Sequence, residues 1–319
     1  MATEASTPKN PLLGWPQASP RGDKLKCMLT YVKLGKNETH LIPFFPRSLS
    51  ANLSMTGISP LYTSLNTTHA YQLNWSLSLF LKSCVPPLVQ WLEPLRRATE
   101  SDAVRILEVR ELERLSLQFY LSTQPHVSPS DIVRSAKGRL QYLLRMTIPQ
   151  AFQRNYGIFS VGAANIHCLE AYVQKQPSRH PMAATHVQQR IDSFQFYDDK
   201  IDLREYRASS HGRYLHNLQI VLENRDHLHD ASERTLSTIR SMVIRSCAKK
   251  NQRLARIGLV SNHLHILLGC SVDESPQMVA LALMNNIAYA FEMKPVLEFS
   301  FYAGTFGPYD RGAIRKEYS

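Results

Sequence analysis

The sequence lacks long hydrophobic runs, secretory signals and closely spaced cysteines. No stretch approaches the ~18 consecutive apolar residues of a membrane-spanning helix, and the first residues carry no basic-then-apolar signal pattern. Its five cysteines are far apart and form no Cys-x-x-Cys pair, which favours reduced thiols. These absences predict a cytoplasmic protein with no membrane partner.

Acidic residues are missing from residues 234–272 and are reduced to Asp131 alone in residues 131–154. The whole chain carries 37 Lys and Arg against 26 Asp and Glu, a formal charge of +11. Basic segments bind phosphates by releasing counterions, whereas solvated helix faces usually interleave Glu with Lys and Arg. Both interpretations stay open, and the lack of acid favours a polyanion. The candidate phosphate contacts are Arg134, Lys137, Arg139, Arg145, Arg245, Lys249, Lys250 and Arg253.

The length of 319 residues accommodates two domains of roughly 150 residues. Residues 1–65 are rich in Pro, Ser, Thr and Asn and are expected to form an extension. A first domain is expected over residues 66–180 and a second over 211–319. The polar, turn-rich segment between them, residues 181–210, is expected to be a linker.

The first domain has alternating and helical patterns in a regular order. Residues 71–80 alternate as a strand does, and residues 104–109 and 115–121 predict two more strands. Ser128-Pro-Ser-Asp131 is typical of a helix start, and a further helix is expected from about 165 to 176, before Pro177.

The second domain repeats this order. Strands are expected at 214–222, at 257–269 as one long apolar strand, and at 297–302. Helices are expected at 232–251 and from Ser275-Pro276 to about Phe291.

An internal duplication explains the repeated order. A shift of 143 residues places Tyr71 on Tyr214 and Asn74 on Asn217. A shift of 147 gives the pairs Ser128 and Ser275, Pro129 and Pro276, Phe152 and Phe299, Gly157 and Gly304, and Phe159 and Phe306. The same shift moves the strand 116–121 onto 263–268.

Two histidines two positions apart mark the second copy of that strand. Alternate residues of a strand share a face, so His263 and His265 form a platform for a divalent metal. A second His-x-His pair, His227 and His229, lies in a polar stretch that we interpret as a loop without a metal role.

The run Ser-Asn-His-Leu-His-Ile-Leu-Leu-Gly (261–269) resembles the HUH motif of single-tyrosine transposases of the insertion-sequence and REP-associated type. The resemblance implies an α+β fold, with ferredoxin-like domains that each have an antiparallel sheet covered by helices. In that family two His on a strand and a Tyr on a later helix form the site, often with a Gln one turn after the Tyr. The Tyr helix of one subunit serves the His pair of the other.

The two halves match this family in complementary ways. The first half has Gln118 where His265 stands in the second, but its last helix carries Tyr172 and Gln176, four apart on one face. The second half has the His pair but ends where the Tyr helix should begin. We therefore expect an intramolecular pseudo-dimer with one composite site.

The resemblance implies a DNA strand transferase. Mg²⁺ or Mn²⁺ would be held by His263, His265 and Gln176, and Tyr172 would attack a phosphodiester to leave a 5′-phosphotyrosine. The expected partner is single-stranded DNA, including hairpins, in a nucleoid-associated protein, and a homodimer of fused chains would supply two sites. Trp75, Tyr142 and Tyr156 could stack bases, although most of these aromatic residues are expected to lie in the core.

The same residues also fit other interpretations. The complementary losses also fit a transposase-derived DNA-binding protein without activity, and the same site fits a nuclease or relaxase that nicks without transposing. Tyr172 could be an ordinary helix tyrosine and Gln176 a solvated helix end. Tyr318 is the rival nucleophile, because the repeat predicts a tyrosine one residue from it.

Overall fold

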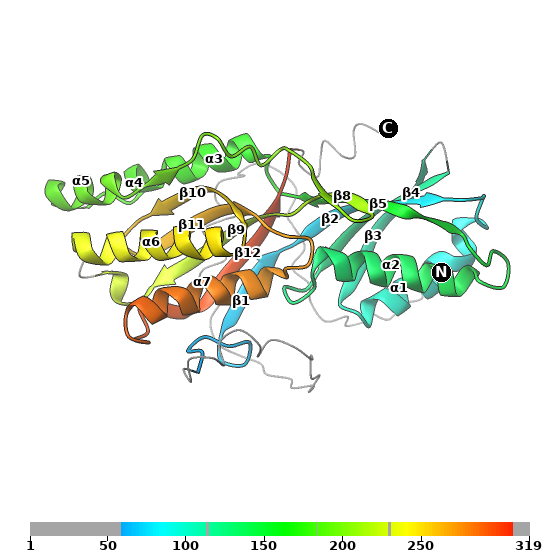
Figure 1. Cartoon of the computed structure of the whole chain (residues 1–319), viewed down its shortest axis with the longest axis horizontal. Coiled ribbons are helices and arrows are strands. Elements are labelled where there is room, and N and C mark those ends of the chain that lie inside the picture. The colour runs from blue at the N-terminus through cyan, green and yellow to red at the C-terminus, as the bar shows by residue number, and fades with distance from the viewer. Residues whose placement is uncertain (1–58, 113–114, 183, 229–230, 309–319) are drawn as a thin grey trace, which may run out of the picture. The chain divides into compact units, whose positions relative to one another are not determined.

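The computed structural model describes residues 59–112, 115–182, 184–228 and 231–308 (Figure 1). Most of the extension expected at 1–65, and the rival nucleophile Tyr318, lie outside the described residues. No helix within the described ranges is both long and apolar enough to span a membrane.

The first half forms a four-stranded antiparallel unit with two helices. Its strands run in the spatial order β3-β4-β2-β5, and its chain order is strand, helix, strand, strand, helix, strand, as in ferredoxin-like folds. Ser128 caps its second helix through a complete capping box with Asp131, as the sequence predicted. The elements are β2 (Asn74–Leu81), α1 (Leu88–Glu100), β3 (Val104–Leu112), β4 (Ser116–Thr123), α2 (Pro129–Leu144) and β5 (Phe152–Val161).

The second half repeats that arrangement. Its strands lie in the order β12-β9-β11-β10, which is the same topology with the same antiparallel pairings. The elements are β9 (Asn217–Asn224), α6 (Glu233–Lys249), β10 (Arg253–Leu259), β11 (His263–Gly269), α7 (Pro276–Ala290) and β12 (Leu297–Phe306). The prediction of an α+β chain with two ferredoxin-like sheets is confirmed.

Each half lends one strand to the sheet of the other. β1 (Thr68–Gln72) pairs in parallel with β12, and β8 (Gly212–Leu215) pairs in parallel with β5. The single strands expected at 71–80 and 214–222 are therefore wrong: the first breaks at Leu73 and the second at His216. Both breaks fall where the chain passes from one sheet to the other. Neither sheet is built from one half alone, and the boundaries at 180 and 211 stay a prediction.

Hydrogen bonds between the halves occur in symmetric pairs. Ser160 Oγ donates to the Phe306 carbonyl (2.7 Å), and Thr305 Oγ1 donates to the Val161 carbonyl (2.8 Å). Likewise Asn217 N donates to Ser160 Oγ and Asn74 N to Thr305 Oγ1. These pairs relate the halves by a pseudo-twofold axis, as an intramolecular pseudo-dimer requires.

The symmetric bonds also fix the register of the repeat. Residues 160 and 305 are equivalent, so the last strands are related by a shift of 145. The sequence alignment by 147, which matched Gly157 with Gly304, is two residues out in this strand. A slip of two keeps every side chain on the same face, so alternation could not reveal it.

The apolar run 257–269 is a hairpin rather than the one long strand expected. β10 ends at Leu259 and β11 begins at His263, with Val260 N donating to the His263 carbonyl (3.0 Å). The two strands pair as antiparallel neighbours, with Gly258 opposite His265.

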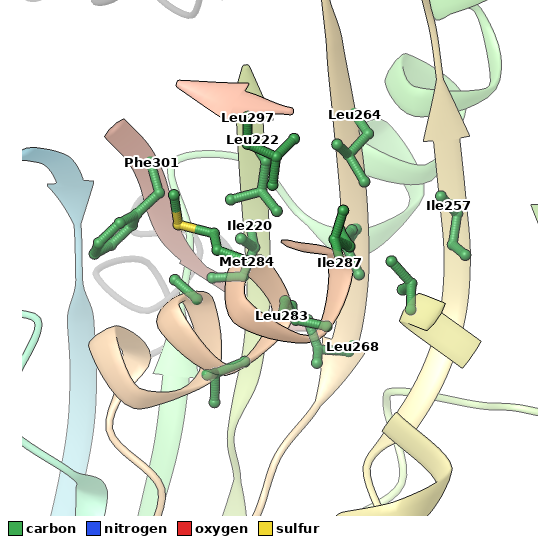
Figure 2. Packing of buried hydrophobic residues seen from close by; sticks show 14 of the residues in the cluster. Ile220, Leu222, Ile257, Leu264, Leu268, Leu283, Met284, Ile287, Leu297 and Phe301 are labelled. Atoms are coloured by element: carbon green, nitrogen blue, oxygen red, sulfur yellow. The ribbon is translucent and has the colours of Figure 1, made fainter. Parts of the chain in front are cut away.

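Helices α6 and α7 cover one face of the second sheet. Figure 2 shows side chains of α7, such as Leu283 and Ile287, packed against strand residues Ile220, Leu264 and Leu268. These strand residues alternate with the histidines, so the His pair lies on the opposite face. The core thus dictates which face is free to carry a site.

The segment expected as a linker contains secondary structure. Helix α5 (Thr185–Ser193) is followed by β6 (Phe196–Tyr197), which pairs with β10, and by β7 (Arg207–Ser209), which pairs with β8. These short strands complete two six-stranded sheets, one per half.

Candidate functional site

A helix of the first half packs on the second sheet beside the histidines. α3 (Ile166–Gln174) starts at Asn165, whose side chain accepts from Cys168 N. The one-turn helix α4 (Gln176–Arg179) follows across Lys175, which keeps a helical backbone. Both helices contact β10.

Close contact between helix and sheet depends on Gly258. A Cβ at this position would lie 2.6 Å from Val173 Cγ1 and 3.3 Å from the Val173 carbonyl oxygen. Gly258 is also the cross-strand neighbour of His265. The missing side chain therefore lets the Tyr172 helix lie directly against the strand beside the His pair.

The two imidazoles converge on one point. His263 Nε2 and His265 Nε2 are 3.0 Å apart, with ring centroids 4.7 Å apart. Their other ring nitrogens are held: His263 Nδ1 by Asn262 Oδ1 (2.9 Å) and His265 Nδ1 by Gln219 Nε2 (3.2 Å). These partners fix the orientation of each ring. His265 Nδ1 accepts from the Gln219 amide, so the neutral His265 ring carries its proton on Nε2 and donates it to His263 Nε2. A metal bound by both Nε2 atoms requires the Gln219 amide to present its oxygen to Nδ1 instead.

Tyr172 meets this pair from the other half of the chain. Its ring lies edge-on to His265, with centroids 5.5 Å apart and planes at 87°. The Gln176 side chain, only 1% exposed, hydrogen-bonds Tyr172. All four residues singled out by the sequence, the His pair, Tyr172 and Gln176, therefore lie together.

Two further residues lie at the site that the sequence did not single out. The Arg179 guanidinium carbon lies 5.3 Å from the centroid of the Tyr172 ring, and the His180 ring lies 5.2 Å from that of His263. Arg179 is seven residues after Tyr172, which is two helical turns. That spacing was a readable signal, whereas His180 follows the end of α4 and had none.

Burial sets the protonation of these groups. It lowers the pKa of His263 to about 4 and that of His265 well below its usual value, with nearby imidazoles adding to the effect. Both rings are thus neutral at pH 7, the form that binds metals. Burial raises the pKa of Tyr172, and the Gln176 hydrogen bond and the Arg179 charge oppose that rise.

The donor set fits a divalent ion. The two Nε2 atoms are hydrogen-bonded to each other at 3.0 Å, a separation that neighbouring ligands of an octahedral ion at about 2.1 Å also have. Gln176 offers an amide oxygen as a third donor. In the described part of the chain, no group of three or more His, Cys, Asp or Glu side chains is arranged to hold a metal. An ion here would thus depend on the two imidazoles, the amide and groups from substrate or water.

The equivalent position in the first sheet has no such chemistry. Gln118 Nε2 donates to Ser76 Oγ (3.2 Å), and Ser116 stands at the position of His263. Gln118 and Ser76 occupy the positions that His265 and Gln219 occupy in the second sheet, and neither they nor Ser116 supplies an imidazole. The described residues therefore provide one site of this kind per chain.

Several predicted phosphate contacts have partners within the protein. Arg139 pairs with Asp102 and Arg134 with Asp131. Lys137 Nζ donates to two carbonyls of β5, and Arg253 donates to the carbonyls of Asp202 and Glu205. Arg245, Lys249 and Lys250 are exposed and have no side-chain partner in the described part of the chain.

These three residues belong to α6 and its end, and α6 covers the face opposite the His pair. The prediction that Trp75 stacks bases is wrong, because this side chain is fully buried and its Nε1 donates to Thr123 Oγ1. Tyr142 is exposed, and the Tyr156 hydroxyl bonds Ser209. His229 lies outside the described residues.

Comparisons with known proteins give low similarity. No protein-family model matches the sequence. No curated protein matches it. Among solved structures, a candidate transposase from Deinococcus radiodurans R1 is 16% identical (TM-score 0.26) over 34% of this chain and 92% of that chain.

A REP-associated tyrosine transposase bound to a REP hairpin is 9% identical (TM-score 0.27) over 37% of this chain and 67% of that chain. A candidate transcriptional repressor of the glycine cleavage system is 8% identical (TM-score 0.19) over 74% and 97%.

Proposed function

We propose that this protein is a single-tyrosine DNA strand transferase of the HUH type with one composite site. The observation that supports it most is the 5.5 Å approach of the Tyr172 ring to the His265 ring, from opposite halves of the chain. A decayed DNA-binding protein has no need to keep a nucleophile, a His pair and a buried Gln together.

The His pair and Gln176 would hold Mg²⁺ or Mn²⁺. Bound there, the ion would polarise a phosphodiester and stabilise the charge that develops on its oxygens. This chain's own residues orient the ligands: Asn262 and Gln219 fix the imidazoles, and Gln176 hydrogen-bonds the phenol.

Tyr172 would perform the covalent step. Its hydroxyl oxygen attacks phosphorus, the bond between phosphorus and the 3′-oxygen breaks, and the 3′-oxygen takes up a proton. The products are a 5′-phosphotyrosine and a free 3′-hydroxyl, while the phenol proton passes to solvent. Because the new ester retains the energy of the diester, a second 3′-hydroxyl can reverse the step and join strands.

The substrate proposed from the resemblance of the His strand is single-stranded DNA beside a hairpin. One site per chain cuts one end at a time. Two fused chains in a homodimer would bring two sites together, and a serial reaction would need only one.

The test is covalent capture of DNA. Purified protein is incubated with labelled hairpin-bearing single strands and Mn²⁺ or Mg²⁺, and adducts are resolved on denaturing gels. We expect an adduct from the native chain and from Tyr289→Phe, an exposed helix tyrosine outside the site. We expect none from Tyr172→Phe, and a loss of at least 10²-fold for His263→Ala.

Metal binding is measured separately by titration calorimetry with Mn²⁺. His263→Ala and His265→Ala should abolish the binding seen with the native chain, while Tyr172→Phe should retain it. DNA binding without any adduct would support the decayed DNA-binding protein instead. An adduct that survives Tyr172→Phe but not Tyr318→Phe would reassign the nucleophile.

Joining separates strand transfer from simple nicking. An unlabelled strand with a free 3′-hydroxyl is added to the isolated adduct, and the labelled product is sized. A longer labelled strand supports transfer, whereas an adduct that only accumulates supports a nuclease or relaxase.

A further inference from the structure

We propose that Arg179 binds the phosphate that Tyr172 attacks. The inference rests on the proposed function and adds a residue to its substrate site. Arg179 ends α4, one turn after Gln176, and its guanidinium carbon lies 5.3 Å from the centre of the Tyr172 ring.

Arg179 is available to an anion. The residue is exposed, and no carboxylate among the described side chains forms an ion pair with its guanidinium. Some other arginines of the chain are neutralised, as Arg139 is by Asp102 and Arg204 by Asp202. An uncompensated guanidinium beside a half-buried phenol is a ready partner for a phosphate group.

The placement complements the His pair. The imidazoles approach Tyr172 through His265, with ring planes at 87°, whereas the guanidinium lies over the ring. Both Arg179 and His265 thus border the ring whose hydroxyl would meet the phosphate. The planar guanidinium can donate two parallel hydrogen bonds to phosphate oxygens, which a lysine cannot. The same side chain would also stabilise the charge that gathers on the phosphate oxygens during the attack.

The first test measures chemistry under single-turnover conditions at saturating DNA. We expect Arg179→Ala to slow adduct formation about 10²-fold and Arg179→Lys about tenfold, because lysine keeps the charge and loses the fork. The matched control is Arg97→Ala, another exposed arginine in the last turn of a helix. Its rate should stay within twofold of the native rate. An equal rate for Arg179→Ala would overturn the inference.

The second test needs no cleavage. In the Tyr172→Phe background, DNA affinity is measured by fluorescence anisotropy with neutral methylphosphonates introduced at one linkage after another. At one linkage the loss caused by Arg179→Ala should shrink from several-fold to less than twofold, since the contacted charge is already gone. No such linkage, with Arg179→Ala equal to the native residue throughout, would contradict a phosphate contact.

The two tests separate the inference from the function on which it rests. If the native chain forms no adduct, the strand-transferase proposal fails. The methylphosphonate scan then still decides whether Arg179 binds a particular phosphate.

Discussion

Substituting Gly258 by alanine should move the Tyr172 helix away from the His strand. The new Cβ would lie 2.6 Å from Val173 Cγ1, about 0.8 Å short of the 3.4 Å at which ordinary contact begins. The valine cannot turn aside freely, because β-branched side chains hold one χ1 rotamer in helices. The Val173 carbonyl oxygen would lie 3.3 Å from the new Cβ, and as a backbone atom it cannot rotate away.

Both stability and activity should respond. Overpacking of this kind costs about 1–3 kcal/mol in the free energy of unfolding, measured by urea denaturation. A displacement of about 1 Å between Tyr172 and His265 should slow adduct formation about 10²-fold. Mn²⁺ binding should weaken less than adduct formation, since both imidazoles stay on the unmoved strand while Gln176 moves with the helix.

Two further variants test whether the contact between Gly258 and Val173 positions the helix. Gly258→Ala combined with Val173→Ala removes the clashing methyl and should recover most of the rate. Gly138→Ala, in a helix where an added Cβ meets nothing within 4 Å, should raise stability by about 0.5–1 kcal/mol and leave the rate unchanged. A Gly258→Ala chain as stable and as fast as the native one would show that the helix is not positioned by this contact.

Three further predictions concern the junction between the halves and the metal. Burial lowers the pKa of His216 to about 4 from 6.5, so the neutral ring stabilises the fold above pH 6.5. About 3 kcal/mol should be lost as pH falls toward 4, and unfolding curves of His216→Gln should show a weaker pH dependence; equal curves would contradict this. Ser160→Ala and Thr305→Val each leave buried backbone groups unpaired and should each cost about 1–3 kcal/mol by urea denaturation; a loss at only one site would contradict the pseudo-twofold axis. Chelation by EDTA should abolish adduct formation without changing the circular dichroism spectrum, and unimpaired activity would exclude the metal.

The sequence predicted the repeated order of elements because local signals repeat. Ser128 and Ser275 cap equivalent helices, each followed by proline at the first turn. The complementary pattern of Tyr172 and the His pair was also readable, since each depends on residue type and spacing along one element. That Tyr172 of the first half would meet the His pair of the second followed only from the resemblance to the single-tyrosine transposases.

What the sequence could not predict depends on tertiary partners. Alternation continues through Leu73 and His216, so nothing local marks the points where the chain leaves one sheet for the other. The turn at Ser261-Asn262 is short and lies inside an apolar run, which hid the hairpin. The role of Gly258 follows only from the Val173 side chain that packs on it.

The most direct measurement of the composite site is the identity of the residue that carries DNA. The covalent adduct is digested with nuclease and protease, and the peptide that carries a nucleotide through its 5′-phosphate is sequenced by tandem mass spectrometry. We predict that this residue is Tyr172 and that the adduct no longer forms when His263 or His265 is replaced by alanine. A modified tyrosine elsewhere, such as Tyr318, or an adduct indifferent to the His pair, would contradict a site assembled from the two halves.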